Sequence, residues 1–140
     1  MFLICHIIGA LAGELFAVLA AVLSFLYLVQ VRLLKERRLD RLMFNLPALD
    51  VLERLLFISL GTGFFFLSLA LLSGSIIFWQ EGMQNSALVG KLIWALVVWS
   101  WYLIALLSRF SWKVSRKTTA RMSLWGFCLL GGAYFGFIFR

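Results

Sequence analysis

A hydrophobic stretch at the start of the chain limits what this protein can fold into. Residues 2–31 contain no lysine, arginine or aspartate, and their only histidine and only acid are His6 and Glu14. About 30 helical residues extend about 45 Å, whereas the hydrocarbon core of a bilayer is about 30 Å thick. The stretch therefore predicts a transmembrane helix with length to spare.

The apolar composition extends over the whole chain. Of its 140 residues, 64% are hydrophobic, and the mean hydropathy is +1.01, which is far more apolar than a soluble domain. Four apolar spans are predicted, at about 2–31, 55–79, 87–108 and 122–139. Because backbone groups in lipid must bond within their own helix, we expect an all-α integral membrane protein with one domain, a four-helix transmembrane bundle.

The net charge of +7 orients the chain in the bilayer. Basic residues gather in the segments 32–54 and 109–121, between apolar spans. Such clusters mark cytoplasmic loops, so both termini are predicted on the external side. The bilayer is therefore the expected partner of this charge, and no nucleic acid is expected.

Small residues dominate the first half of the first span and predict close packing against a neighbouring helix. They are Gly9, Ala10, Ala12, Gly13, Ala17, Ala20 and Ala21. Glu14 lies among them, about 12 Å along the helix axis from His6. Eight residues also rotate Glu14 by about 80° from His6, so a direct bond between the two is not expected.

Pro47 punctuates the first basic segment before the second apolar span. Asp50 is a predicted N-cap, with Glu53 at the third helical position, where a carboxylate complements the helix dipole. Arg54 is interpreted as an interfacial anchor. A cap and an anchor are favoured over a catalytic pair.

The third span carries a lysine and two tryptophans that could contact a ligand: Lys91, Trp94 and Trp99. A lysine near the external end of a helix can extend its amine to water, which is a sufficient structural role. A lysine beside tryptophans also suits a flat anionic ligand, such as a porphyrin with its propionates. Both interpretations remain open from the residues alone.

The order of these residues resembles the C-terminal half of the haem-handling cytochrome c assembly proteins of the CcsA type, in their YpjD/HemX-like branch. The similar positions run from the first span to the last: His6, Pro47, Leu49, Leu52, Glu53, Arg54, Phe57, Gly63, Gly74, Lys91, Trp94, Trp99, Gly126, Tyr134 and Gly136. The resemblance implies a multi-pass protein of the bacterial inner membrane that handles haem during cytochrome c biogenesis. It makes His6 a candidate axial ligand of haem iron, and Lys91, Trp94 and Trp99 possible haem contacts.

The chain also departs from that family pattern. The tryptophan-rich haem-binding loop is replaced by residues 82–90, and the histidine that follows the third helix is absent. A second axial ligand would have to come from Met83, another copy of the chain or a membrane protein partner. We therefore expect an assembly factor or partial subunit, and do not favour an enzyme.

Two further functions compete with haem handling. An acid inside the first span is also typical of small proton-coupled exporters, in which Glu14 would bind protons or a cation. The small-residue faces also suit a scaffolding subunit without a cofactor, and His6 would then be an interfacial polar residue. No phosphate-binding loop, nucleophile elbow or metal-ligand cluster occurs in the sequence, which excludes the common hydrolase and kinase classes.

Overall fold

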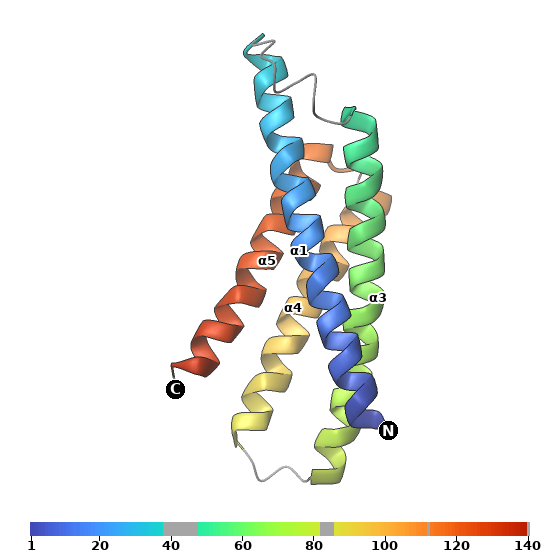
Figure 1. The fold of residues 1–140 in the computed structure, drawn as a ribbon, viewed down its shortest axis with the longest axis vertical. Helices are drawn as coiled ribbons and strands as arrows, with labels where there is room; N and C mark the ends of the chain where they lie inside the picture. Colours follow the sequence, from blue (N-terminus) through green and yellow to red (C-terminus); the bar gives the residue numbers. More distant parts are fainter. Residues whose placement is uncertain (38–47, 82–85, 112, 140) are drawn as a thin grey trace.

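The part of the chain that the structure describes folds entirely into helices. The computed structural model describes residues 1–37, 48–81, 86–111 and 113–139. Its helices are α1 (Phe2–Lys35), α3 (Leu49–Glu81), α4 (Ser86–Ser111) and α5 (Arg116–Ile138), which run up and down in one bundle (Figure 1). The predicted all-α fold is confirmed.

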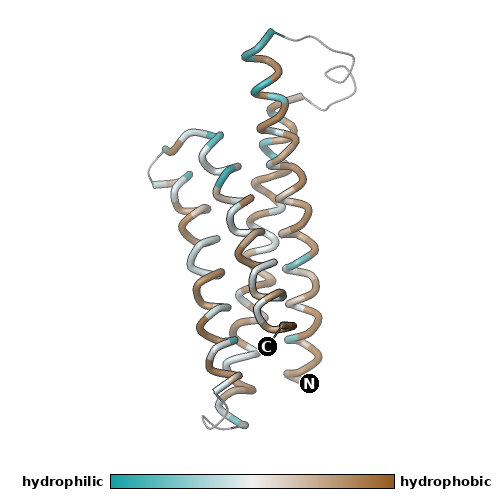
Figure 2. Tube along the Cα trace, turned by 90° about the vertical axis from the view of Figure 1, so that its left-hand side faces the viewer, coloured by the Kyte–Doolittle hydropathy of each residue, from teal (hydrophilic) through white to brown (hydrophobic). Residues whose placement is uncertain are grey.

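Within those residues, α1, α3 and α4 are long and apolar enough to cross a membrane. Hydrophobic residues cover most of their length, and hydrophilic ones gather towards one end of the bundle (Figure 2). Helix α5 has 23 residues, and its first turns carry basic side chains. The structure thus supports a multi-pass membrane protein, whereas a crossing by α5 and the side on which the termini lie stay predictions.

All four described helices extend past the predicted apolar spans at the basic end, α4 by three residues to Ser111. Helix α1 continues beyond Val31 to Lys35, α3 begins at Leu49 instead of residue 55, and α5 begins at Arg116 instead of residue 122. Hydropathy marks only the part of a helix that suits lipid, whereas helical hydrogen bonding continues into the polar interface. Helix α1 ends just before Arg37, whose φ of 52° is incompatible with a continuing helix.

The start of α3 corrects the capping prediction for Asp50. The helix begins one residue earlier, and the N–H of Val51 donates to the carbonyl oxygen of Ala48 at 3.0 Å. Asp50 therefore lies in the first turn, where its charge still complements the helix dipole. Pro47 lies outside the described residues.

Small residues bring α1 into close contact with α3, as predicted. A Cβ atom added to Gly9 would lie 3.4 Å from the backbone nitrogen of Ala70, and one added to Gly13 would lie 3.1 Å from the Leu67 side chain. A Cβ on Gly63, from the α3 side, would lie 3.6 Å from the Gly13 carbonyl oxygen. An added Cβ atom would be in ordinary contact at Gly9 and in tighter than usual contact at Gly13, so the two helices pack closely along this line.

The buried core lies in the half of the bundle nearer the basic end. Its largest members are Leu23, Tyr27, Leu52, Leu56, Leu60, Val98 and Tyr102. Large apolar side chains also cover the outer faces, such as Leu15 at 72% exposure and Phe110 at 73%. Apolar residues on both the inside and the outside fit a protein whose surrounding solvent is lipid.

Replacing Gly13 with leucine is expected to destabilise the bundle by about 1–3 kcal/mol, the usual cost of overpacking. Thermal unfolding of the purified protein in detergent measures the loss. Gly61→Leu is the matched control, because nothing lies within 4 Å of a Cβ atom added to Gly61. Equal losses in the two variants would contradict the close α1–α3 contact.

Candidate functional site

All four helices line a cavity of about 660 Å³ near the end of the bundle at which both termini lie (Figure 1). This volume falls within the range of about 300–1,000 Å³ that is typical of small-molecule and cofactor sites. The lining is mostly apolar with a few polar groups: His6, Glu14, Lys91, Trp94, Trp99 and Tyr134. The structure thus brings five residues that the sequence singled out into one cavity.

The imidazole of His6 is held by the backbone of α3. Its Nδ1 lies 2.8 Å from the carbonyl oxygen of Ala70, which can only accept a hydrogen bond. Nδ1 therefore carries the proton, and in the neutral ring Nε2 keeps its lone pair. Histidines that bind metals typically donate their second ring N–H to a carbonyl in this way.

Gly74 makes room for the His6 ring. A Cβ atom added to Gly74 would lie 3.0 Å from Cε1 and 3.2 Å from Nδ1 of His6. An alanine at this position would require the ring to shift by a few tenths of an ångström relative to the carbonyl that orients it. Gly74 is therefore a positioning residue for His6.

Glu14 is linked to the far side of the cavity by Tyr134. The Tyr134 hydroxyl donates a hydrogen bond to Glu14 Oε1, which joins α1 to α5. His6 and Glu14 thus line one cavity with separate partners, Ala70 for the histidine and Tyr134 for the acid.

The tryptophans of α4 are fixed by their indole N–H groups. Trp94 donates to the carbonyl oxygen of Leu129 at 3.2 Å, and Trp99 donates to Ser68 Oγ at 2.9 Å. Trp99 also stacks on Phe64, with ring centroids 5.3 Å apart. With their polar edges bonded to protein, the rings give the cavity rigid, flat and apolar surfaces.

Lys91 lies at the rim of the cavity. Its side chain is exposed, and Nζ lies 5.7 Å from the centroid of the Phe137 ring, a cation–π contact between α4 and α5. The ammonium group is thus near both the cavity and the surface, and both predicted roles of Lys91 remain compatible with its position.

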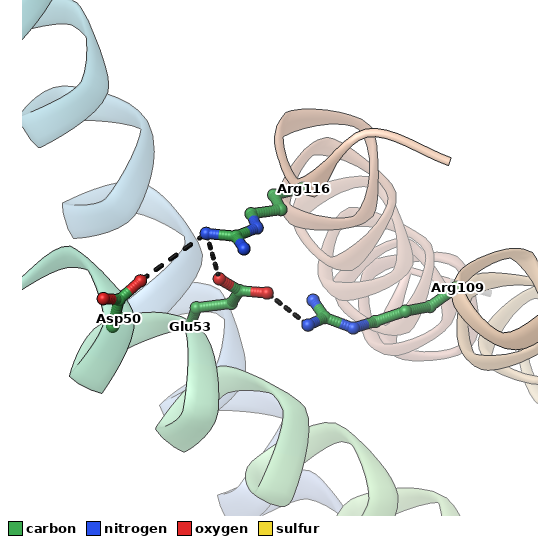
Figure 3. A network of polar contacts seen from close by, with 4 residues as sticks. All are labelled: Asp50, Glu53, Arg109 and Arg116. Carbon is green, nitrogen blue, oxygen red and sulfur yellow. Dashed lines mark hydrogen bonds and ion pairs between the residues drawn. The ribbon is translucent and has the colours of Figure 1, made fainter. Parts of the chain in front are cut away.

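A second polar cluster joins three helices at the basic end (Figure 3). Glu53 of α3 is 7% exposed and forms ion pairs with Arg109 of α4 and with Arg116 of α5, the latter with Nη1 3.0 Å from Oε2. Arg116 also lies 3.5 Å from Asp50 Oδ1. Because a buried carboxylate is costly without partners, this cluster keeps the ends of α3, α4 and α5 together.

This cluster corrects the interpretation of Glu53 as a helix cap. Its carboxylate reaches across to other helices instead of back to its own first turn. Arg54 is exposed, as an anchor would be, and lines a groove with Phe57 and Arg109. An unpaired acid next to an apolar span is costly, so the sequence does indicate that Glu53 has a basic partner. Nothing in the sequence selects Arg109 and Arg116 among the other basic residues.

The helices and the cavity define a multi-pass helical membrane protein with a candidate ligand site inside its bundle. A family model described as cytochrome C assembly protein matches residues 1–139. The chain belongs to this family, which confirms the family resemblance seen in the sequence and supports a role in cytochrome c biogenesis, whereas the branch within the family stays a prediction. Comparisons with curated proteins and with solved structures find no match.

Replacing Glu53 with glutamine is expected to destabilise the protein by about 1–3 kcal/mol. The expected cost is below the 3–5 kcal/mol typical of a broken buried pair, because the Arg109 and Arg116 side chains are 34% and 58% exposed and regain water. Chemical unfolding in detergent measures the change, with Asp50→Asn as the control, since the Asp50 side chain is 90% exposed. A control that loses as much stability as Glu53→Gln would refute a special role for the buried acid.

Proposed function

We propose that the protein binds haem in the cavity and acts as an assembly factor or partial subunit in cytochrome c biogenesis. The observation that carries this proposal is the geometry of His6, with Nδ1 bonded to the Ala70 carbonyl and Nε2 left with its lone pair. A single oriented imidazole is the kind of ligand that holds haem iron. Family membership makes haem the appropriate ligand to test.

The cavity offers the other features that a bound haem would need. Trp94 and Trp99 provide flat apolar surfaces for a macrocycle, and Lys91 at the rim provides a cation for a propionate. Bound haem would supply an iron centre, which the protein would tune through its axial ligand and the surrounding hydrogen bonds. The protein's own contribution is to orient the His6 ring and to exclude water with apolar walls.

The second axial ligand has three candidate sources: Met83, a second copy of the chain or a membrane protein partner. Met83 lies outside the described residues, and His6 is the only histidine of the chain. All three sources stay part of the proposal. The exposed apolar faces of α1 and α3 suit either a partner or lipid.

The orientation proposed for this function follows from charge. The basic residues near the ends of α1, α4 and α5 favour the cytoplasmic side, which leaves His6 and the termini on the periplasmic side of the bacterial inner membrane. Haem would then bind on the side on which cytochromes c are assembled.

The alternative of a proton-coupled exporter is less well supported. Glu14 lines the cavity, as such a function needs, but its carboxylate is bonded to Tyr134. Nothing in the family assignment points to export. Glu14 and Tyr134 are better interpreted as a link between α1 and α5 beside the haem-binding cavity.

Protein purified from cells supplied with ample haem is expected to show an intense haem absorption band that is lost or shifted in His6→Ala. Removal of the imidazole takes away the proposed axial nitrogen, whereas the neighbouring Cys5→Ala keeps it. Cys5 is a suitable control because it is an exposed thiol, another potential iron ligand, next to His6 in the sequence. A parent without haem, or a band unchanged in His6→Ala, would refute the proposed site.

Replacing Gly74 with alanine is expected to weaken haem retention by about 10- to 100-fold, the usual cost of disturbing a group that orients a metal ligand. The added methyl group would displace the His6 ring, which lies 3.0 Å from its position. Titration with haem measures the affinity, and Gly131→Ala is the control because nothing lies within 4 Å of a Cβ atom there. Equal affinities in the two variants would mean that Gly74 does not position His6.

A further inference from the structure

Three hydroxyl groups in the interior lack a protein partner within the described part of the chain. They belong to Tyr102 of α4, which is 2% exposed, and to Thr119 and Ser123 of α5, which are 2% and 0% exposed. A buried hydroxyl without a hydrogen bond costs free energy, so each such group needs an explanation.

The two α5 hydroxyls differ from six serine and threonine hydroxyls on the other helices. Ser24 donates to the Ala20 carbonyl oxygen at 2.7 Å, and Ser73 donates to that of Leu69 at 2.8 Å. The same bond to the helix's own backbone is formed by Thr62, Ser68, Ser75 and Ser108. This is the usual way to satisfy a hydroxyl within a membrane helix. Thr119 and Ser123 do not use it, and their hydroxyls are left for a partner between the helices.

The Tyr102 side chain lies where α4 packs against α5. A Cβ atom added to Gly126 would lie 2.9 Å from Tyr102 Cζ, the carbon that bears the hydroxyl. The tyrosine therefore ends against the α5 face on which Ser123 and Thr119 follow at successive turns. One helical turn rises about 5.4 Å, which is about two hydrogen bonds of 2.8 Å, so one water molecule can bridge groups one turn apart.

The interface also connects the two polar regions of the bundle. Val98 lines the cavity, and Tyr102 lies one turn further along α4, beneath the cavity floor. At the other end, Thr119 lies one turn from Arg116, which pairs with Glu53. The three hydroxyls thus lie in the buried interval between the cavity and the ion pairs.

We propose that ordered water molecules bind between α4 and α5 and bridge Tyr102, Ser123 and Thr119. They form a hydrated track that extends from the cavity floor towards the Glu53 ion pairs. Buried water typically makes about three hydrogen bonds to polar groups that would otherwise be unsatisfied, and these hydroxyls supply them. The track does not depend on haem, so its test is independent of the test of the proposed function.

Thermal unfolding of Tyr102→Phe, Ser123→Ala and the double variant tests the proposal, because dry and hydrated interiors predict opposite signs. In a dry interface, removal of an unsatisfied hydroxyl raises the Tm. In a hydrated one, each single variant loses a water-mediated bond and the Tm falls by about 2–4 °C. Ser73→Ala is the control, since this buried hydroxyl is satisfied by its own helix.

The double variant shows whether the hydroxyls share water. If they do, the first substitution already removes the water bridge. The fall in Tm of the double variant is then smaller than the sum of the falls of the two single variants. A higher Tm for Tyr102→Phe, or single losses that simply add, would overturn the proposal. A fall equal to that of Ser73→Ala would likewise overturn it, because the loss would then be that of any buried hydroxyl.

Discussion

The close contact between α1 and α3 determines the rest of the structure. Gly9, Gly13 and Gly63 allow the two backbones to approach until a single added carbon would meet the neighbouring helix. In lipid, such packing replaces the hydrophobic effect as the force that joins helices. It also brings a carbonyl of α3 within hydrogen-bonding distance of His6, so one contact both builds the bundle and orients the candidate ligand.

The two ends of the bundle are held in different ways. At the basic end, Glu53 binds two arginines from other helices, and the buried core packs beside it. At the opposite end, the tryptophans of α4 are fixed by their own hydrogen bonds, and a cavity remains among the helices. The core and the ion pairs hold the helices together at one end, and the cavity lies at the other. This arrangement suits a ligand site, because the contacts that hold the helices together do not depend on the ligand.

Sequence reasoning found the helices and most of the polar cavity residues, but not the contacts between them. Hydropathy gave the spans, and small residues gave the α1–α3 contact, since both properties are local. The bond between Tyr134 and Glu14 joins residues 120 positions apart, and that between Arg109 and Glu53 joins residues 56 apart. Such pairs depend on how each helix is rotated and crosses its neighbours, which a hydrophobic pattern alone does not fix. The capping prediction for Glu53 failed for this reason, because a local role was assigned to a side chain whose partners are distant.

The ion pairs of Glu53 have a practical consequence for handling the protein. The arginines are partly exposed to water, so dissolved ions screen their attraction to the acid, over a Debye length of about 8 Å at physiological ionic strength. The contacts at the cavity end are mostly apolar and respond to the chain length and shape of the surrounding amphiphile instead. The salt concentration and the choice of detergent therefore act on opposite ends of the same molecule, and a purification that preserves one end need not preserve the other.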